Sequence, residues 1–396
     1  MLKVGSAVLS ALVLLQACTP EHSRPAEPQA AQSPAPKLKT APARPDDEIP
    51  GLLAKITAVH PGTGIVVGLI GPTGLRIFSR GVFDKNDQRP VGPDTEFELA
   101  SVTKVFTSLV LADMVRHGEV ALDDPAAKYL PGVKMPIRNG KQITLVDLAT
   151  MTSGLPSDPP DAPDEESEAN YGLGRLDAFL ATYKLTRDPG AEWEYSNIGI
   201  TLLARALASR AGKPFPTLFN ERVAGPLGLK DTVFDLAPEQ RSRLAPGHDE
   251  TSETMPYAPV PEVLLGAGGL NSTANDMLKF LALELGPADN PLKDDLALLL
   301  SIDRPISPDI PDQAHQALGW AVGATKTLGP LINKEGGGFG YQSYLVYLPE
   351  TGTGIVVLSN IFADDELGDF GDYLLGAIKA WPCPPSTTTG GGCEVN

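Results

Sequence analysis

Strand-like segments lie near both ends of the chain, and the long stretch between them is mainly helical. Residues 64–70 and 75–83 flank the Gly71-Pro72-Thr73-Gly74 turn, a pattern typical of a β-hairpin. Residues 342–347 and 354–359 have the same strand-like character near the other end. Because one sheet can hold both pairs only if the two ends of the chain meet, we predict an α+β fold. In this fold an antiparallel sheet is flanked by helices and carries a mostly helical insertion.

Apolar residues recur at helical spacing in several segments between the strands. The predicted helices span residues 102–116, 145–151, 197–210 and 273–285, and a last helix at about 370–381 closes the body. Ser272 or Thr273 is expected to cap the fourth helix, with Asp276 completing a capping-box-like pair with Thr273.

The bulk composition limits the classes of partner. The chain has 396 residues, 42% of them hydrophobic, which suits a globular unit of one or two domains. Its formal net charge of -17 argues against nucleic acid as a partner. No Cys-x-x-Cys or His-Glu-x-x-His motif occurs, so we expect neither a metal nor a cofactor. We expect a monomer.

The first residues resemble an export signal. Lys3 precedes a short apolar core at residues 7–15, and Leu15-Gln16-Ala17-Cys18 resembles a bacterial lipobox, in which the cysteine thiol is acylated. An ordinary signal peptide with an incidental cysteine is the alternative, and it would leave a soluble periplasmic protein. We predict a lipoprotein on the periplasmic face of a bacterial membrane, held there by its lipid alone; inner and outer membrane remain open.

Composition also divides the chain into segments. We predict a lipoprotein signal peptide at 1–18, a Pro/Ala-rich disordered tether at 19–47, one folded domain at 48–382 and a C-terminal tail at 383–396. Cys383 and Cys393 are predicted to form a local structural disulfide, because the protein is expected to be exported.

Three short motifs suggest chemistry when they are taken together. Ser101 and Lys104 form the only Ser-x-x-Lys, and residues three apart on a helix share one face, so a nucleophile and a base can meet. Tyr195-Ser196-Asn197 is the only Tyr-x-Asn, and Lys334-Glu335-Gly336 follows later. Ser-x-x-Lys, Tyr-x-Asn and Lys-x-Gly in this order are typical of active-site serine, penicillin-recognising enzymes.

Longer segments extend this resemblance to a family. Those that resemble the class C β-lactamase-related family are 97–104, 148–156, 193–197, 225–229, 267–270 and 334–360. The similarity covers roughly residues 64–360, and within the family 139–156 and 334–349 look closest to periplasmic penicillin-binding DD-carboxypeptidase/endopeptidases. It implies the serine β-lactamase/penicillin-binding-protein-like transpeptidase fold.

The resemblance and the chemistry of the side chains imply catalytic roles. Ser101 is the expected nucleophile, which attacks a carbonyl group and forms an acyl-enzyme. Lys104 must be largely neutral to accept its proton, and burial together with a second cation, Lys334, would lower its pKa. Tyr195, as a phenolate, is the alternative base. The backbone N–H groups of Ser101 and Gly337 are the expected oxyanion hole.

Substrate binding is assigned to Asn197, Lys334, Glu335 and Gly336. Asn197 would hold the substrate amide. Glu335 departs from the family pattern, because a hydroxyl residue usually stands between the lysine and the glycine. A carboxylate about 4 Å from an anionic substrate would be repelled by roughly 4 kcal/mol. Either Glu335 points away from the site, as strand alternation allows, or the substrate lacks that carboxylate.

These residues predict a serine hydrolase that works through an acyl-enzyme. The leading hypothesis is a D-alanyl-D-alanine carboxypeptidase/endopeptidase that acts on peptidoglycan peptides. A class C-like β-lactamase is the first alternative, and an esterase or D-amino-acid amidase on the same scaffold, which Glu335 favours, is another. A silent binding lipoprotein would not need Lys104. No Gly-x-Ser-x-Gly occurs, so an α/β-hydrolase is unsupported.

Overall fold

The computed structural model describes residues 45–71, 74–159, 171–286, 290–306, 314–325 and 329–362. The predicted signal peptide and most of the predicted tether lie outside these ranges, as do Cys18, Cys383, Cys393 and the helix expected at 370–381. The lipid anchor and the disulfide therefore stay predictions.

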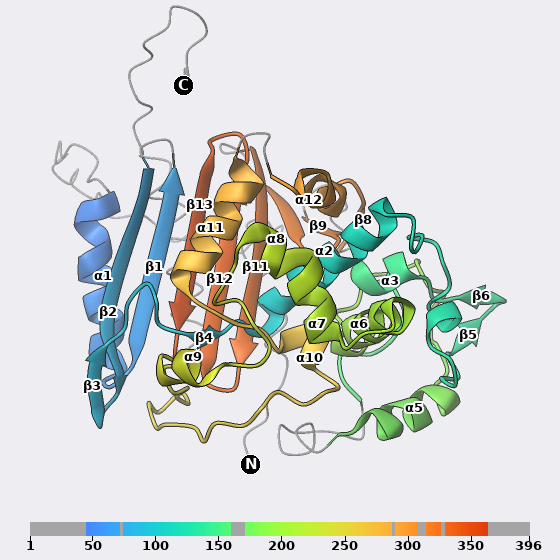
Figure 1. Ribbon diagram of the computed structural model, residues 1–396, viewed down its shortest axis with the longest axis horizontal. Helices are drawn as coiled ribbons and strands as arrows, with labels where there is room; N and C mark the ends of the chain where they lie inside the picture. Colours follow the sequence, from blue (N-terminus) through green and yellow to red (C-terminus); the bar gives the residue numbers. More distant parts are fainter. Residues whose placement is uncertain are drawn as a thin grey trace, which may run out of the picture.

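Within the described ranges, nine strands form one sheet in the order β3-β2-β1-β13-β12-β11-β10-β9-β8. Their bounds are β1 Gly64–Gly71, β2 Gly74–Asp84, β3 Asp87–Pro90, β8 Asp303–Pro305, β9 Ala314–Ala317, β10 Ala321–Thr325, β11 Gly329–Gly338, β12 Tyr341–Leu348 and β13 Thr353–Ser359. The first strand pairs with the last, antiparallel, with Val67 opposite Val357. Figure 1 shows this as a blue strand beside a red one. The predicted meeting of the two chain ends is confirmed.

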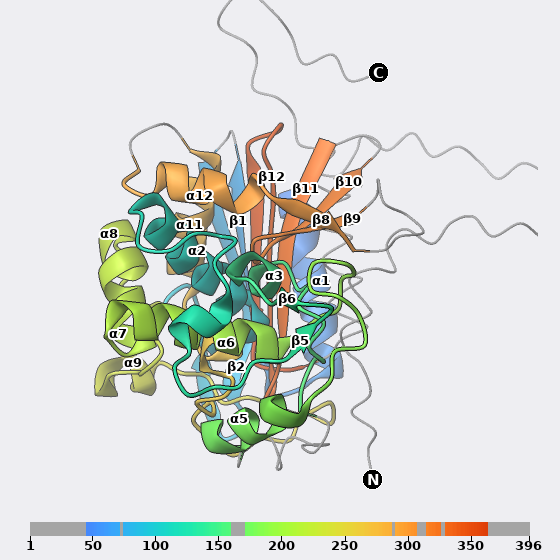
Figure 2. The ribbon, with the colours of Figure 1, turned by 90° about the vertical axis from the view of Figure 1, so that its right-hand side faces the viewer.

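Helices cover both faces of the sheet. Their bounds are α1 Pro45–Val59, α2 Thr103–Arg116, α3 Leu145–Ala149, α5 Leu173–Thr182, α6 Asn197–Ala211, α7 Phe215–Phe219, α8 Gly225–Leu227, α9 Pro238–Ser242, α10 Leu265–Gly268, α11 Ala274–Leu285 and α12 Lys293–Leu300. Figure 2 places α1 on one side of the sheet and α2 and α11 on the other. None of the helices in the described ranges is long and apolar enough to cross a membrane.

The sheet therefore separates two apolar cores. Ile65 and Val67 of β1 point to the α1 side, where they pack with Ile49 and Leu53. Val66, between them, points to the larger core on the helical side. This alternation follows from the period of two along a strand, and it decides which residues of β11 can face the helices.

The middle of the chain builds the helical side, and α2 is its central helix. Every residue of α2 from Thr103 to Met114 is buried. The helix α2 contacts α6, α10 and α12, so its first turn is fixed from several directions. Short turns η2 Ala100–Val102, η3 Ala126–Tyr129 and η4 Asn220–Ala224 join the helices, and the short pairs β4 Phe97–Glu98 with β7 Asn271–Ser272 and β5 Ile137–Arg138 with β6 Lys141–Gln142 lie outside the main sheet.

Some expected boundaries differ from the structure. Helix α1 begins at Pro45, inside the segment predicted as tether up to residue 47; a proline followed by acidic residues is a typical helix start. The helix expected at 145–151 ends at Ala149, and Met151 has a left-handed backbone with φ of 57°.

Helix α11 has the predicted N-cap residue but not the predicted capping box. Thr273 is the N-cap, and its hydroxyl accepts a hydrogen bond from the Asp276 backbone N–H at 3.3 Å. The reciprocal bond of a capping box is not made, because the Asp276 carboxylate accepts instead from Asp231 N–H at 2.7 Å and from the Thr232 hydroxyl at 3.0 Å. The capping-box prediction was wrong, since tertiary partners took the carboxylate.

Candidate active site

The predicted nucleophile lies where a short strand becomes the central helix. Strand β4 leads through Leu99 and Ala100 into the turn η2, and Ser101 stands just before α2. Leu99 is held by three hydrogen bonds: its N–H donates to the Leu270 carbonyl, and its carbonyl accepts from the Ser343 hydroxyl and from the Val102 N–H. Ala100 has φ of 44°, a left-handed backbone that costs an L-residue roughly 1 kcal/mol. The surrounding packing holds this strained turn before Ser101.

The three residues predicted to be catalytic come together. The Lys104 Nζ atom lies 2.8 Å from Ser101 Oγ and donates to the Ala267 carbonyl at 2.7 Å. On the other side, Ser101 Oγ lies 2.5 Å from the hydroxyl of Tyr195. The serine oxygen therefore contacts an amine and a phenol at once.

The surroundings of Lys104 disfavour its charged form. Its side chain is fully buried, and this burial lowers its pKa well below the ordinary value of 10.5. The Lys334 cation lowers it further, while Asp158 opposes the shift. The neutral amine keeps a lone pair, which is the state that can accept the proton of Ser101.

Tyr195 is shifted in the opposite sense. Burial raises its pKa well above the ordinary value of 10, and the nearby carboxylates Asp158 and Glu335 add to this, although the hydrogen bond with Ser101 opposes it. The phenol therefore keeps its proton at neutral pH. These electrostatics favour Lys104 over Tyr195 as the basic group of the free protein.

Strand β11 brings the third motif against the nucleophile. Lys334 Nζ lies 5.3 Å from the centre of the Tyr195 ring. A Cβ atom on Gly336 would lie 2.3 Å from the Leu99 carbonyl oxygen and 2.7 Å from the backbone nitrogen of Ser101. Only glycine fits there, so the backbone of β11 can approach Ser101. Gly337, the other expected oxyanion donor, is the next residue on the strand.

Glu335 faces away from Ser101. In the pairing of β11 with β12, Lys334 lies opposite Leu345, which belongs to the core on the helical side. Glu335 lies opposite Tyr344, which packs against the core on the α1 side. Of the two alternatives that the sequence left open, the geometry corresponds to the first. Through space, the Glu335 carboxylate still raises the pKa of Lys334 against the larger lowering by burial.

Asn197 begins α6 and is held by a residue that the sequence analysis did not identify. Its Nδ2 donates to Asp158 Oδ1 at 2.8 Å, and the Ser157 hydroxyl donates to the other oxygen at 2.5 Å. The Ser157 carbonyl accepts the Asn197 backbone N–H at 2.9 Å. The only sequence signal for Asp158 was its place two residues after Pro156, where a segment resembling the family ends.

Ser343 is a second residue that the sequence analysis missed. It lies opposite Gly336 across the β11–β12 pair, and its hydroxyl donates to the Leu99 carbonyl at 2.7 Å. It ties β12 to the turn before Ser101. Strand alternation could have placed Ser343 on the helical side, but no sequence pattern linked it to Leu99.

Comparisons with known proteins bear on the family to which the chain belongs. The family described as Beta-lactamase matches residues 51–378. The D-alanyl-D-alanine-carboxypeptidase/endopeptidase AmpH of Escherichia coli (strain K12) is 35% identical over 286 residues, which are 67% of this chain and 71% of that protein. A Beta-lactamase of Escherichia coli (strain K12) is 29% identical over 328 residues, covering 75% of this chain and 84% of that one.

Solved structures give the same result for the fold. A class C beta lactamase from Rhodobacter sphaeroides superimposes with a TM-score of 0.71 at 25% identity, covering 84% of this chain and 99% of that chain. A Beta-lactamase/D-alanine Carboxypeptidase from Yersinia pestis, complexed with citrate, gives a TM-score of 0.72 at 28% identity with the same coverage. The family match extends over most of the chain, and the fold predicted from the motifs is confirmed. The protein belongs to the beta-lactamase family.

Proposed function

We infer that this protein is a serine hydrolase that works through an acyl-enzyme and cleaves peptidoglycan peptides as a D-alanyl-D-alanine carboxypeptidase/endopeptidase. The observation that carries this proposal is the buried Lys104 amine 2.8 Å from Ser101 Oγ. A nucleophile beside an uncharged base is what acyl transfer requires. The name of the Escherichia coli relative AmpH supports the peptide as substrate.

The proposed reaction begins with attack of Ser101 Oγ on the substrate carbonyl, while its proton passes to Lys104. The backbone N–H groups of Ser101 and Gly337 stabilise the oxyanion. Tyr195, whose hydroxyl lies 2.5 Å from Ser101 Oγ, gives its proton to the departing amine and is reprotonated by Lys104. In the second half, water gives a proton to Lys104 and attacks the acyl carbonyl; the Ser101 ester bond then breaks, Ser101 Oγ takes that proton from Lys104, and the carboxylic acid product leaves.

The substrate side of the proposal uses three other residues. Lys334 is a cation beside Tyr195 and would pair with the substrate carboxylate. The Asn197 amide, positioned by Asp158, would bind the substrate amide. Gly336 lets β11 lie close to the backbone of Ser101, beside which the peptide would bind. Because Glu335 faces the other side of the sheet, it does not oppose an anionic substrate at close range, and this favours a peptide over an ester that lacks the carboxylate.

A β-lactamase is the second candidate, because relatives of this chain carry that name and the same serine, lysine and tyrosine would serve it. The two functions differ in how fast water removes the acyl group. A fluorescent penicillin separates them. Stable labelling indicates a peptidase, rapid turnover indicates a β-lactamase, and no labelling indicates an esterase or a silent binding protein. Mass spectrometry of muropeptide digests then identifies the bond that is cut, with Ser101→Ala as the control.

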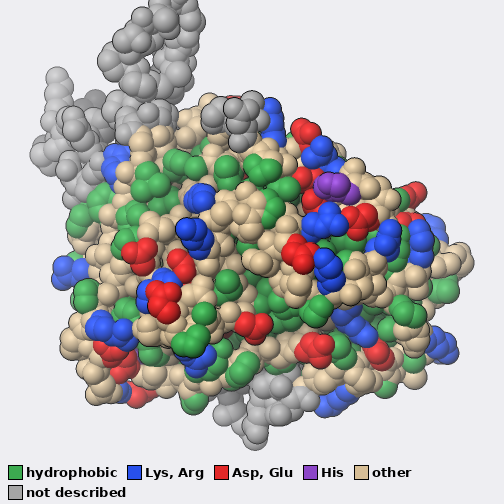
Figure 3. Space-filling model, in the orientation of Figure 1, with side chains coloured by type: hydrophobic (Ala, Val, Ile, Leu, Met, Phe, Trp, Pro, Cys, Tyr) green, Lys and Arg blue, Asp and Glu red, His purple; other side chains and the backbone are tan. Residues whose placement is uncertain are grey.

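Location remains a proposal that depends on the first residues of the chain. We retain an exported lipoprotein anchored through Cys18, acting as a monomer on small acyl substrates rather than on nucleic acid. On the face shown in Figure 3, Lys and Arg side chains are interspersed with Asp and Glu and form no continuous basic patch. Cys18→Ser should move the protein from the membrane fraction to the soluble fraction; unchanged membrane association would contradict the anchor.

A further inference from the structure

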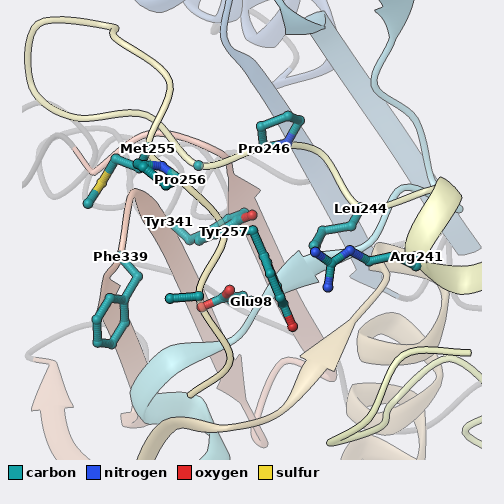
Figure 4. A pocket seen from close by; sticks show the side chains of 11 residues that line it. Glu98, Arg241, Leu244, Pro246, Met255, Pro256, Tyr257, Phe339 and Tyr341 are labelled. Atoms are coloured by element: carbon teal, nitrogen blue, oxygen red, sulfur yellow. The ribbon is translucent and has the colours of Figure 1, made fainter. Parts of the chain in front are cut away.

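A cavity lies close to the candidate active site but contains none of its catalytic residues. Its volume is about 290 Å³. It is lined by the end of β4, by α9, by the segment 244–258 and by the turn between β11 and β12. Figure 4 shows Glu98, Arg241, Tyr257 and Phe339 around it. Nothing in the proposed reaction uses this space.

Glu98 is a buried acid for which the described residues supply no partner. Its side chain is 6% exposed, and among the described residues no hydrogen-bond donor or cation lies within bonding distance of its carboxylate. The backbone cannot swing it out, because β4 pairs Glu98 with Asn271 of β7. The Glu98 oxygens are not among the fully buried unpaired atoms, so they are accessible from the cavity. A largely buried carboxylate is costly to charge, and a cation bound in the cavity would offset that cost.

Arg241 does not neutralise this acid. Its guanidinium carbon lies 3.2 Å from the centre of the Tyr257 ring, so it stacks on the ring instead of meeting Glu98. The other lining residues, among them Met255 and Phe339, are mostly apolar. The cavity therefore presents the Glu98 carboxylate and the stacked Arg241 guanidinium on a mainly apolar wall.

We propose that this cavity binds an alkylammonium group, with the Glu98 carboxylate as its counter-ion and the ring of Tyr257 and the apolar wall around its carbon stem. An ammonium group donates up to three hydrogen bonds, which Glu98 is free to accept. An aromatic face attracts a cation as well. A carboxylate or phosphate ligand would instead face the charge of Glu98 at short range. The volume suits a stem of a few carbons.

The titration of Glu98 agrees with this assignment. Burial raises its pKa to about 7, and Arg241 opposes the shift. Tyr341, the buried neighbour from β12, stays a neutral phenol because burial raises its pKa well above 10. Binding of an ammonium group would then draw the proton off Glu98, and affinity should fall as the pH drops from 8 to 6.

The ammonium group has two sources, a side chain of the peptide substrate or a free small amine. Strand β11 passes Ser101 at Gly336 and ends beside the cavity before Phe339, about 10 Å further along the strand. A peptide that lies along β11 would reach the cavity within a few residues. If the amine belongs to the peptide, Glu98 selects the substrate, and this reading rests on the proposed function.

Direct binding tests the site without any catalytic assay. Titration calorimetry of the full-length protein with n-butylammonium at constant ionic strength should show binding, while n-butanol and butanoate should not bind. Glu98→Gln, which keeps the shape and removes the charge, should weaken the binding at least about tenfold, a difference of about 1.4 kcal/mol. Glu239→Gln removes an equal charge from an exposed position on α9 and should leave the affinity within about twofold.

Two further variants keep the test decisive. Arg241→Gln removes the competing cation and should tighten amine binding, and Tyr257→Ala should weaken it, so the two changes have opposite signs. Thermal denaturation checks that each variant is folded. Equal affinity of the wild type and Glu98→Gln, or no amine binding by the wild type, overturns the proposal.

The source of the amine is separated by kinetics. A peptide substrate with a free side-chain amine should lose at least about tenfold in kcat/KM in Glu98→Gln, while its N-acetylated form and the rate of penicillin labelling stay unchanged. The other outcome is that Glu98→Gln weakens butylammonium binding but has the same kcat/KM as the wild type for the free-amine peptide and for its N-acetylated form. That outcome assigns the site to a free small amine. If penicillin labels neither protein, the proposed function fails, while the calorimetric result still decides the site.

Discussion

The amine nitrogen of Lys104 lies 2.8 Å from the hydroxyl oxygen of Ser101, and the lysine side chain is fully buried. The pKa of a lysine in this position is lowered, because burial and the neighbouring cation Lys334 both disfavour the charged form. The same burial holds Tyr195 as a phenol. One low-dielectric site thus prepares a base and an acid, each in the protonation state that acyl transfer starts from.

Removal of the amine tests its role as the base. Lys104→Met keeps the buried stem and removes the nitrogen, so the acylation rate should fall about a thousandfold, within the usual contribution of a general base. Stopped-flow labelling with a fluorescent penicillin measures the rate. A loss of less than about tenfold, in a variant with an unchanged far-UV spectrum, contradicts Lys104 as the proton acceptor.

Removal of the phenol should have a smaller effect on acylation. Tyr195→Phe keeps the ring next to both lysines and removes the hydroxyl, so acylation should slow about a hundredfold, because the leaving amine loses its proton donor. The comparison with Lys104→Met in the same assay matters most. If Tyr195→Phe is as inactive as Ser101→Ala while Lys104→Met retains activity, Tyr195 is the base and our assignment is reversed.

The pH profile should report the lowered pKa of Lys104. Because the neutral amine is the active form, kcat/KM should rise with pH through an acidic limb that lies well below 10.5. Lys334→Met removes a cation that lowers this pKa, so the limb should move to higher pH. A limb that stays in place or moves to lower pH would show that Lys334 does not act on Lys104. The matched control is Lys279→Met, an exposed lysine bonded to the Gly228 carbonyl.

Space at Gly336 can be tested by one methyl group. Gly336→Ala would place a Cβ 2.3 Å from the Leu99 carbonyl oxygen, so β11 must move away from Ser101 and acylation should fall about a hundredfold. Gly323→Ala on β10 is the control, because its new Cβ would meet atoms no closer than 3.9 Å. Equal acylation rates for both variants would show that close contact of β11 with Ser101 is unimportant.

Stability should respond to a buried acid outside the site. Glu96 is 0% exposed and its oxygens have no hydrogen-bond partner among the described residues. Burial raises its pKa from 4.5 to about 8, and this outweighs the opposite effect of Arg243, whose Nη2 lies 3.6 Å from Glu96 Oε1. Because the pKa of Glu96 is higher in the folded protein than in the unfolded chain, its contribution to stability is fully present below pH 4.5. This contribution is lost as the pH rises through 8. Glu96→Gln should therefore raise the free energy of unfolding at pH 8 by about 3 kcal/mol and flatten its fall between pH 5 and 8. Urea denaturation measures both; a variant that is less stable than the wild type at pH 8 contradicts this.

The candidate catalytic residues could be predicted from the sequence, because they stand in short motifs with characteristic spacing. Ser101, Lys104 and Tyr195 were identified from three short motifs, and the structure brings them within hydrogen-bond distance. The two-ended sheet followed from strand patterns at residues 64–83 and 342–359. The motif residues were sufficient to predict the site, and the strand-like residue patterns were sufficient to predict the sheet.

Tertiary contacts explain what the sequence did not predict. Asp158 binds Asn197 across 39 positions, and Ser343 binds Leu99 across 244, so no local pattern connects either pair. Asp276 has the right spacing for a capping box but binds a distant loop instead. The side of the sheet on which Glu335 lies was left open, because it depends on the register of β11 with β12, which the sequence alone did not determine.

The central claim is that Ser101 carries the acyl group. The most direct measurement is mass spectrometry of a proteolytic digest of the protein quenched in acid during its reaction with penicillin. Our account predicts a single penicilloyl adduct on the peptide that contains Ser101, and none in Ser101→Ala. An adduct on any other residue, or labelling that persists in Ser101→Ala, would contradict it.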